Sequence, residues 1–265
     1  MNKVDTITNI LKIEINQLRN SQKPKIIFIG GYPGAGKSLL IKKVHDELFN
    51  NEFSIIEPDL YRKYFTEASS VEETVSRTNE IELNLLLYSI EKRKDIIHIS
   101  SLRAFKYIDS LINELLIPSN YDIYLYIIYT NKSESALSTY ERYIYDKFNN
   151  EPFPRMNKYE YLISAYSGFD DAIQFFSKKD YFKEVIIFKR GNLMETPISL
   201  KKLYNNIVDE INEESIRQYR ELNLNDLQVR VDNVKQALKS KYEIKEFEKV
   251  LNGIIYNQKI KKLDR

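Results

Sequence analysis

Apolar residues recur in two alternating patterns along the first two thirds of the chain. Short runs of consecutive apolar residues predict buried strands, and apolar positions three and four residues apart predict amphipathic helices. The runs occupy residues 25–29, 53–57, 95–100, 121–129 and 184–189. Helical spacing occupies residues 37–49, 71–92, 105–116, 133–148 and 158–177. Because strands alternate with helices, we predict an α/β fold, a parallel sheet flanked by helices on both faces.

Two of the predicted helices have a stripe of apolar residues. We expect the helix at residues 5–19 to pack on the domain, although a partner helix could use the same stripe. Its stripe consists of Ile7, Ile10, Leu11, Ile15 and Leu18. For the helix at residues 71–92, the inward positions are Val75, Leu83, Leu86, Leu87 and Ile90.

The character of the sequence changes after Gly191. Residues 198–263 have few strand signals and place apolar residues at helical spacing among many Lys and Glu. We therefore predict two parts. Residues 1–195 form the α/β core with its N-terminal helix, and residues 196–265 form a helical region that packs on the core or extends from it.

A glycine-rich loop lies between the first strand and the next helix. Its sequence is Gly30-Gly31-Tyr32-Pro33-Gly34-Ala35-Gly36-Lys37-Ser38, which holds four of the seven glycines of the chain and matches the Walker A pattern. Glycines let backbone N–H groups approach a polyphosphate closely, and the helix that begins at Lys37 adds its positive dipole end. We predict that residues 31–38 bind ATP or GTP, with Lys37 on the β- and γ-phosphates and Ser38 on Mg²⁺.

Composition narrows the possible chemistry. Of the 265 residues, 43% are hydrophobic and 29% charged, as in ordinary globular domains, and the net charge of +2 gives no reason to expect nucleic acid or a membrane surface as partner. The chain has no cysteine, which excludes disulfides, thiolate zinc sites and a cysteine nucleophile. No apolar run approaches the roughly 20 residues that span a bilayer, and no signal-peptide core follows Met1, so we expect a cytoplasmic protein.

Further candidate residues follow the strands at the edge of the sheet where the loop lies. Phosphoryl transfer needs positive charge along the path of the transferred group and a base for an acceptor hydroxyl. Asp59, just past the second strand, is a candidate base; it is also a candidate N-cap for the helix from Leu60 onward, and the two roles are compatible. Arg142 and Arg155 are candidates for the positive charge, because guanidinium groups match phosphoryl oxygens, or are solvated surface charges. Ser101 and Arg103 follow the third strand and are candidates for binding the acceptor.

The motifs in this order resemble the zeta toxins of bacterial toxin–antitoxin modules, kinases that phosphorylate the amino-sugar 3′-hydroxyl of UDP-N-acetylglucosamine. The loop is similar to the family's Gly-Gly-x-Pro-Gly-Ser/Ala-Gly-Lys, and Ile56-Glu57-Pro58-Asp59-Leu60-Tyr61-Arg62 resembles its acid-x-Asp-x-Phe-Arg/Lys segment, which implies that Asp59 is the base. Arg77-Thr78-Asn79-Glu80 resembles its Arg-x-x-Glu helix, which implies that Glu80 binds the sugar nucleotide. Ser138-Thr139-Tyr140-Glu141-Arg142-Tyr143 resembles its Glu-Arg-Tyr turn, and Arg155 follows Pro154 where the second arginine of the family is expected.

The chain departs from the family pattern at two points. The third strand ends in Ile99-Ser100-Ser101 where the family usually has Glu-Gly-Thr, so the acid is absent and only Ser101 can replace the threonine. Glu80 lies a few residues further upstream than expected, which leaves Glu82 as a substitute. The missing carboxylate implies weaker Mg²⁺ handling, a different acceptor or an attenuated enzyme.

The resemblance implies a P-loop kinase core that uses ATP and Mg²⁺, takes a UDP-amino sugar and is held inactive by a protein antitoxin. Two alternatives stay open. One is a P-loop phosphotransferase for another small hydroxylated acceptor, such as an antibiotic or a nucleoside. The other is a nucleotide-binding regulatory module without turnover, in which the C-terminal helices contact a protein.

Histidines and tyrosines add little to this prediction. His45 and His98 are expected to be structural, because neither has a second metal ligand at a diagnostic spacing. Tyr32, Tyr61 and Tyr143 are expected to pack in the core, with stacking on a nucleobase as the alternative.

Overall fold

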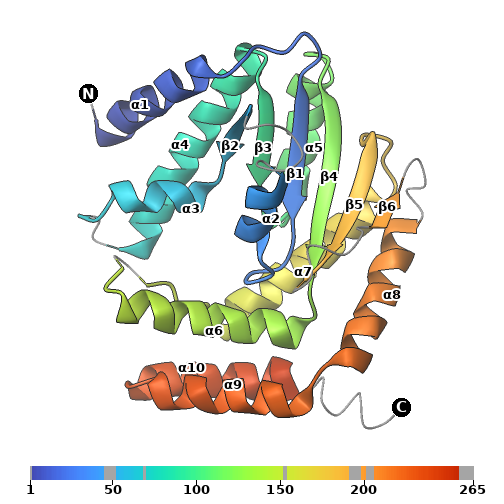
Figure 1. Ribbon diagram of the computed structural model, residues 1–265. Coiled ribbons are helices and arrows are strands. Elements are labelled where there is room, and N and C mark those ends of the chain that lie inside the picture. Colours follow the sequence, from blue (N-terminus) through green and yellow to red (C-terminus); the bar gives the residue numbers. More distant parts are fainter. Residues whose placement is uncertain are drawn as a thin grey trace.

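The centre of the protein is a six-stranded sheet with the strand order β2-β3-β1-β4-β5-β6 (Figure 1). The computed structural model describes residues 2–44, 52–67, 70–151, 154–190, 198–200 and 206–256. Strands β1 to β5 run parallel, and β6 runs antiparallel to β5. The strands are β1 (Lys25–Gly30), β2 (Phe53–Ile56), β3 (Asp95–Ile99), β4 (Asp122–Tyr129), β5 (Glu184–Lys189) and β6 (Ile198–Leu200). The predicted parallel sheet with flanking helices is confirmed.

Strand β1 lies in the middle of the sheet, between β3 and β4. Its residue Ile27 is in register with Ile97 on one side and Tyr124 on the other, and Ile26–Ile29 are fully buried. A strand covered on both faces has no solvated side, which explains why its apolar run is uninterrupted. Because the strands are parallel, the segments that follow β1 to β5 all lie at one edge of the sheet.

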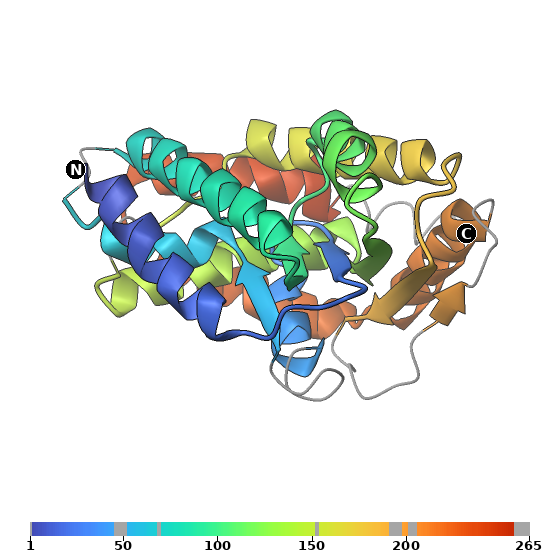
Figure 2. The ribbon, with the colours of Figure 1, turned by 90° about the horizontal axis from the view of Figure 1, so that it is seen from above.

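Helices cover both faces of the sheet. Figure 2 shows α4 (teal), α5 (green) and α7 (yellow) along one face and α2 (blue) on the opposite face. The helices of the core are α1 (Lys3–Gln17), α2 (Lys37–Lys43), α3 (Pro58–Tyr61), α4 (Val71–Glu91), α5 (Phe105–Leu111, continued by a π-helical turn to Leu116), α6 (Lys132–Phe148) and α7 (Tyr159–Phe176). No helix in the described ranges has a segment long and apolar enough to cross a bilayer.

Within the described residues after the sheet, the helices are α8 (Asn206–Glu221), α9 (Leu224–Ala237) and α10 (Lys241–Val250, continued by a π-helical turn to Ile255). α9 and α10 lie along α6, below the carboxyl ends of the strands in Figure 1. The Phe247 ring of α10 is 4.7 Å from the Tyr140 ring of α6, and both side chains are fully buried. The expected division between residues 195 and 196 lies outside the described residues.

The structure corrects the prediction for the start of the C-terminal region. Residues 198–200 were expected to be helical, but they form β6 and pair with β5, with Val185 opposite Leu200. A three-residue strand is shorter than one helical turn, so apolar spacing cannot identify it. The helix predicted at 37–49 is described as α2 up to Lys43, and residues 45–51, including His45, lie outside the described residues.

The inward face of α4 also differs from the prediction. Leu83 and Leu87 are 43% and 41% exposed, whereas Ile81 and Leu85 are buried. The buried face also includes small polar residues: the Ser89 hydroxyl lies 2.9 Å from the Ser54 hydroxyl of β2. A prediction that counts only apolar positions misplaces such a face. In α1, by contrast, Ile7 and Ile15 of the predicted stripe are buried, and Ile10 is 53% exposed.

Candidate active site

The glycine-rich loop curls between β1 and α2 and requires glycine at two of its positions. Gly34 and Gly36 have φ angles of 71° and 100°, which side chains with a Cβ rarely adopt. A Cβ at Gly34 would also lie 2.8 Å from the carbonyl oxygen of Ser135 in α6. The Ser135 hydroxyl donates a hydrogen bond to the Pro33 carbonyl at 2.5 Å, so α6 holds the loop directly.

Lys37 begins α2 and turns back over the loop. Its Nζ donates hydrogen bonds to the carbonyl oxygens of Gly31 and Tyr32, both at 3.0 Å. The Lys37 pKa is lowered to about 8, mainly because burial desolvates the ammonium; Asp59 and Glu57 act against this shift and Arg142 acts with it. The charges of Asp59, Glu57 and Arg142 therefore all act on the Lys37 ammonium.

Glu57 is a site neighbour to which the sequence analysis gave no role of its own. The Ser38 hydroxyl donates to Glu57 Oε1 at 3.1 Å, and Glu57 is 7% exposed. Burial raises the Glu57 pKa, the bond from Ser38 lowers it, and Asp59 raises it. The only sequence signal for a role of Glu57 in the site was its position as the acid of the acid-x-Asp segment. Its carboxylate lies beside the hydroxyl that we expect on the metal.

Arg62, just past Asp59 at the end of β2, is acted on by several charged side chains. Burial lowers the Arg62 pKa, Arg155 and Arg142 lower it further, and Asp59 raises it. The charges of Asp59, Arg142 and Arg155 therefore all act on the Arg62 guanidinium. The sequence analysis did not assign Arg62 to the site, although it occupies the Arg/Lys position of the resembled segment.

Arg103 and Arg155 meet at one aromatic ring. Their guanidinium carbons lie 5.3 Å and 4.9 Å from the ring centre of Tyr161, in the first turn of α7. Cation–π contacts of this kind hold arginines in place without neutralising their charge. Tyr161 was not among the predicted site residues, because a tyrosine at the start of an amphipathic helix carries no signal of such a role.

The third strand ends beside the glycine-rich loop. The Ser100 hydroxyl accepts a hydrogen bond from the Leu102 amide at 3.0 Å, and Leu102, with φ of 57°, is fully buried. A Cβ on Gly30 would lie 2.3 Å from Leu102 Cδ1, so the two segments touch. Ser101 is half-buried in this turn.

The two glutamates considered for the acceptor differ in their surroundings. Glu80 is exposed on α4. Glu82 Oε1 lies 2.8 Å from Nε2 of His98, and the two side chains are 21% and 3% exposed. His98 packs edge-on against Phe28 with ring centres 5.5 Å apart. Glu82 is therefore the carboxylate that reaches the end of β3, and His98 lies within the core.

The three tyrosines considered for base stacking are buried. Tyr32, Tyr61 and Tyr143 are 2%, 4% and 8% exposed. The Tyr32 hydroxyl donates to Asp170 at 2.6 Å, and its ring lies 4.8 Å from the Phe169 ring. The stacking alternative is wrong for all three residues, and Tyr32 instead fastens the loop to α7.

A cavity of about 340 Å³ opens at the carboxyl ends of β4 and β5, against the last turn of α8. Asn131, the residue just before α6, closes one side of the cavity. Its backbone N–H donates to Gln218 Oε1 of α8 at 2.7 Å. The lining residues are Thr130, Asn131, Glu134, Lys189, Arg190, Arg217, Gln218, Glu221, Leu222 and Asn223.

Comparison with solved structures shows the same fold in several proteins. A chain of the PezAT chromosomal toxin–antitoxin system of Streptococcus pneumoniae superposes with a TM-score of 0.63 at 17% identity, covering 83% of this chain and 95% of that chain. A chain of the native AvrRxo1-ORF1:-ORF2 complex gives a TM-score of 0.56 at 11% identity, covering 95% and 83%. The same complex with ATP gives 0.56 at 13% identity, covering 95% and 84%.

Sequence comparison gives the family. None of the curated proteins matches this chain. The family model described as zeta toxin matches residues 9–196, which is well over half of the chain and includes the glycine-rich loop, Asp59, Arg142 and Arg155. The protein therefore belongs to the zeta toxin family.

Proposed function

We propose that this protein is a kinase that uses ATP and Mg²⁺ to phosphorylate the amino-sugar 3′-hydroxyl of UDP-N-acetylglucosamine. The observation that carries the proposal is the glycine-rich loop, whose Ser38 hydroxyl lies 3.1 Å from Glu57 Oε1 and whose Lys37 is acted on by the charges of Asp59, Glu57 and Arg142. Phosphoryl transfer requires little more than a phosphate-binding loop with charged side chains arranged around it. Membership of a kinase-like family supports the same reaction class.

In the proposed reaction, the charged residues around the loop take different tasks, and Arg155 serves both the transferred group and the acceptor. Lys37 leaves the carbonyls of Gly31 and Tyr32 and pairs with the β- and γ-phosphates. The acceptor oxygen attacks the γ-phosphorus, the bond to the bridging oxygen of ADP breaks, and Asp59 takes the proton of the hydroxyl. Arg142 and Arg155 stabilise the charge on the transferred group.

Ser38 and Glu57 are the residues that would hold Mg²⁺. Hydroxyl and carboxylate oxygens are the ligands this ion takes, and Glu57 Oε1 is 3.1 Å from the Ser38 hydroxyl. When bound, Mg²⁺ neutralises charge on the β- and γ-phosphates. Glu57 thus supplies, from the end of β2, the carboxylate that is absent from the end of β3.

The arginines that stack on Tyr161 support an acceptor that carries phosphate. Arg103 and Arg155 present two guanidinium groups at one ring, and each guanidinium can donate two parallel hydrogen bonds to the oxygens of a phosphate. We assign Arg103 and Ser101 to the acceptor. For the sugar we prefer Glu82 over Glu80, because Glu82 reaches the end of β3 and Glu80 is exposed. The cytoplasm, where ATP and UDP-sugars are made, is the proposed place of action.

We also propose a protein antitoxin as partner. The structural neighbours come from a toxin–antitoxin system and from a two-protein complex, and this supports a similar arrangement here. Growth arrest on expression of the wild-type protein, absent for Lys37→Ala, is the expected cellular effect. Arrest by Lys37→Ala as strong as that by wild type would contradict a toxin that acts through the nucleotide site.

The test is incubation of the purified protein with ATP, Mg²⁺ and a panel of UDP-sugars, hexosamines, nucleosides and aminoglycosides. We expect a phosphorylated product from UDP-N-acetylglucosamine, and none from Asp59→Asn, which removes the base and retains the shape of the side chain. Phosphorylation of another acceptor alone would assign the enzyme to the first alternative. Stoichiometric ATP binding with an inert panel would favour the regulatory module.

A further inference from the structure

The two edges of helix α6 meet different parts of the molecule. Its first turns hold the glycine-rich loop through Ser135, whose hydroxyl donates to the Pro33 carbonyl. Two turns later α6 carries Arg142, which is exposed at the sheet edge and acts on the pKa of Lys37. Any tilt or fraying of α6 beyond Ser135 would therefore move Arg142 relative to the loop.

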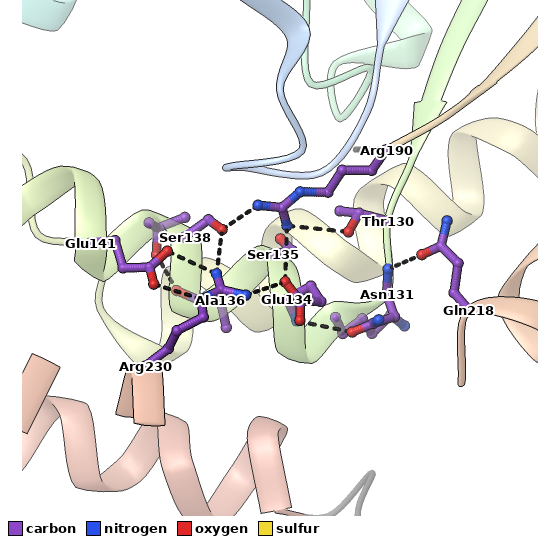
Figure 3. Close-up of polar contacts among 12 residues, drawn as sticks. Thr130, Asn131, Glu134, Ser135, Ala136, Ser138, Glu141, Arg190, Gln218 and Arg230 are labelled. Atoms are coloured by element: carbon purple, nitrogen blue, oxygen red, sulfur yellow. Dashed lines mark hydrogen bonds and ion pairs between the residues drawn. The ribbon is translucent and has the colours of Figure 1, made fainter. Parts of the chain in front are cut away.

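The residue before Arg142 is tied to helix α9. Arg230 forms a forked pair with Glu141, with Nε to Oε1 at 2.7 Å and Nη2 to Oε2 at 2.8 Å. The same guanidinium donates to Glu134 Oε2 at 2.7 Å and to the Ser138 hydroxyl at 3.3 Å. Figure 3 shows Arg230 reaching across two turns of α6 in this way. Forked arginine–carboxylate pairs fix orientation as well as distance.

The residue after Arg142 is tied to helix α10. The Tyr143 hydroxyl donates to Glu243 Oε1, and Lys147 Nζ donates to the same oxygen at 2.5 Å. Glu243 Oε2 accepts the backbone N–H of Ser240 at 2.9 Å, so the carboxylate is fixed to its own helix cap. Glu243 is only 6% exposed. Both sequence neighbours of Arg142 are thus anchored to the C-terminal helices.

Arg190 connects the same face of α6 to the sheet. It follows β5, and its guanidinium donates to Thr130 at 3.3 Å and to Ser138, and lies 3.6 Å from Glu134 (Figure 3). Arg190 and Arg230 therefore both contact Ser138 and Glu134. Through these shared contacts, Arg230 of α9 belongs to a polar network that also includes Thr130 at the end of β4.

We infer that Arg230 and Glu243 are positioning residues that hold the middle of α6 so that Arg142 meets the transferred phosphoryl group. The expected effect on kcat rests on the proposed function, whereas the structural role of the two residues in holding α6 does not. Displacement of a catalytic group by about 1 Å costs up to about a hundredfold in rate. Loss of either anchor should therefore lower kcat and leave nucleotide binding at the loop intact.

The kinetic test compares Arg230→Gln and Glu243→Gln with Lys235→Ala, which changes an exposed residue on the same helix as Arg230. For both anchor variants we expect kcat to fall about ten- to a hundredfold, with the KM for ATP within about twofold, and no change for the control. In an Arg142→Ala background, Arg230→Gln should have no further effect. An equal further loss in that background would overturn the inference, because Arg230 would then act by another route.

Amide hydrogen exchange tests the same inference without an acceptor. We expect Arg230→Gln to speed exchange in α6 beyond Ser138 and to leave α4 and the sheet unchanged, whereas Lys235→Ala changes neither. Unchanged exchange in α6 would overturn the inference, and so would faster exchange throughout the protein, which indicates general destabilisation. If wild-type protein phosphorylates no acceptor, the proposed function fails, and exchange in α6 still decides the role of the anchors.

Discussion

Nucleotide affinity should depend on pH through Lys37. The Lys37 pKa is lowered from 10.5 to about 8, mainly by burial, so the ammonium loses its proton within an accessible pH range. A bound polyphosphate raises that pKa again, because it adds negative charge beside the ammonium. If only the protonated form binds, the apparent Kd between pH 7.5 and 9.5 rises about 25-fold, equivalent to about 1.9 kcal/mol.

The assay is an equilibrium titration of a fluorescent ATP analogue at constant ionic strength across this range, where the phosphates are fully ionised. Lys37→Arg is the matched control, since a guanidinium stays charged and should make the affinity independent of pH. Asp59→Asn should move the midpoint to lower pH, and Arg142→Gln should move it to higher pH, because their charges act on Lys37 in opposite directions. A flat profile for wild type would refute the reasoning.

Three further predictions follow from single contacts. Glu57→Gln should raise the Mg²⁺ concentration needed for half-maximal transfer about tenfold and leave metal-free nucleotide binding unchanged. A Mg²⁺ titration measures this, and an unchanged half-maximal Mg²⁺ concentration would show that Glu57 does not hold the metal. Gly34→Ala should lower the free energy of unfolding by about 1–2 kcal/mol in a denaturant titration and abolish nucleotide binding, because φ is 71° and Ser135 leaves no room for a Cβ. Tyr161→Leu should raise the KM for the acceptor about tenfold and leave the KM for ATP unchanged, because the tyrosine ring holds Arg103 and Arg155. A rise in the KM for ATP alone would contradict this.

Local signals were enough to predict strands β1 to β5 and the glycines that shape the loop after β1. The runs that became β1 to β5 are apolar because strands of a covered parallel sheet lack a solvated side. Gly34 and Gly36 are needed for backbone reasons that act within a few residues. Such features depend on short stretches of chain, so a sequence pattern can reveal them.

Features that depend on packing between distant segments were not predictable. The Glu82–His98 pair joins α4 to β3, and nothing in either segment marks the other as its partner. The pairing of Arg230 with Glu141 spans 89 residues. Strand β6 forms because β5 offers an open edge, and the buried Ser89 of α4 has its partner, Ser54, in β2. In each case the tertiary contact overrides the local pattern.

The central claim is that Asp59 and the loop around Lys37 act on one hydroxyl. Its most direct test is phosphorus and proton NMR of UDP-N-acetylglucosamine after incubation with ATP, Mg²⁺ and either wild type or Asp59→Asn. We predict a new monoester phosphorus signal coupled to the sugar H3 proton with wild type, and no such signal with Asp59→Asn at equal nucleotide occupancy. A signal of equal size with Asp59→Asn, or none with wild type while ATP is bound, would contradict the claim.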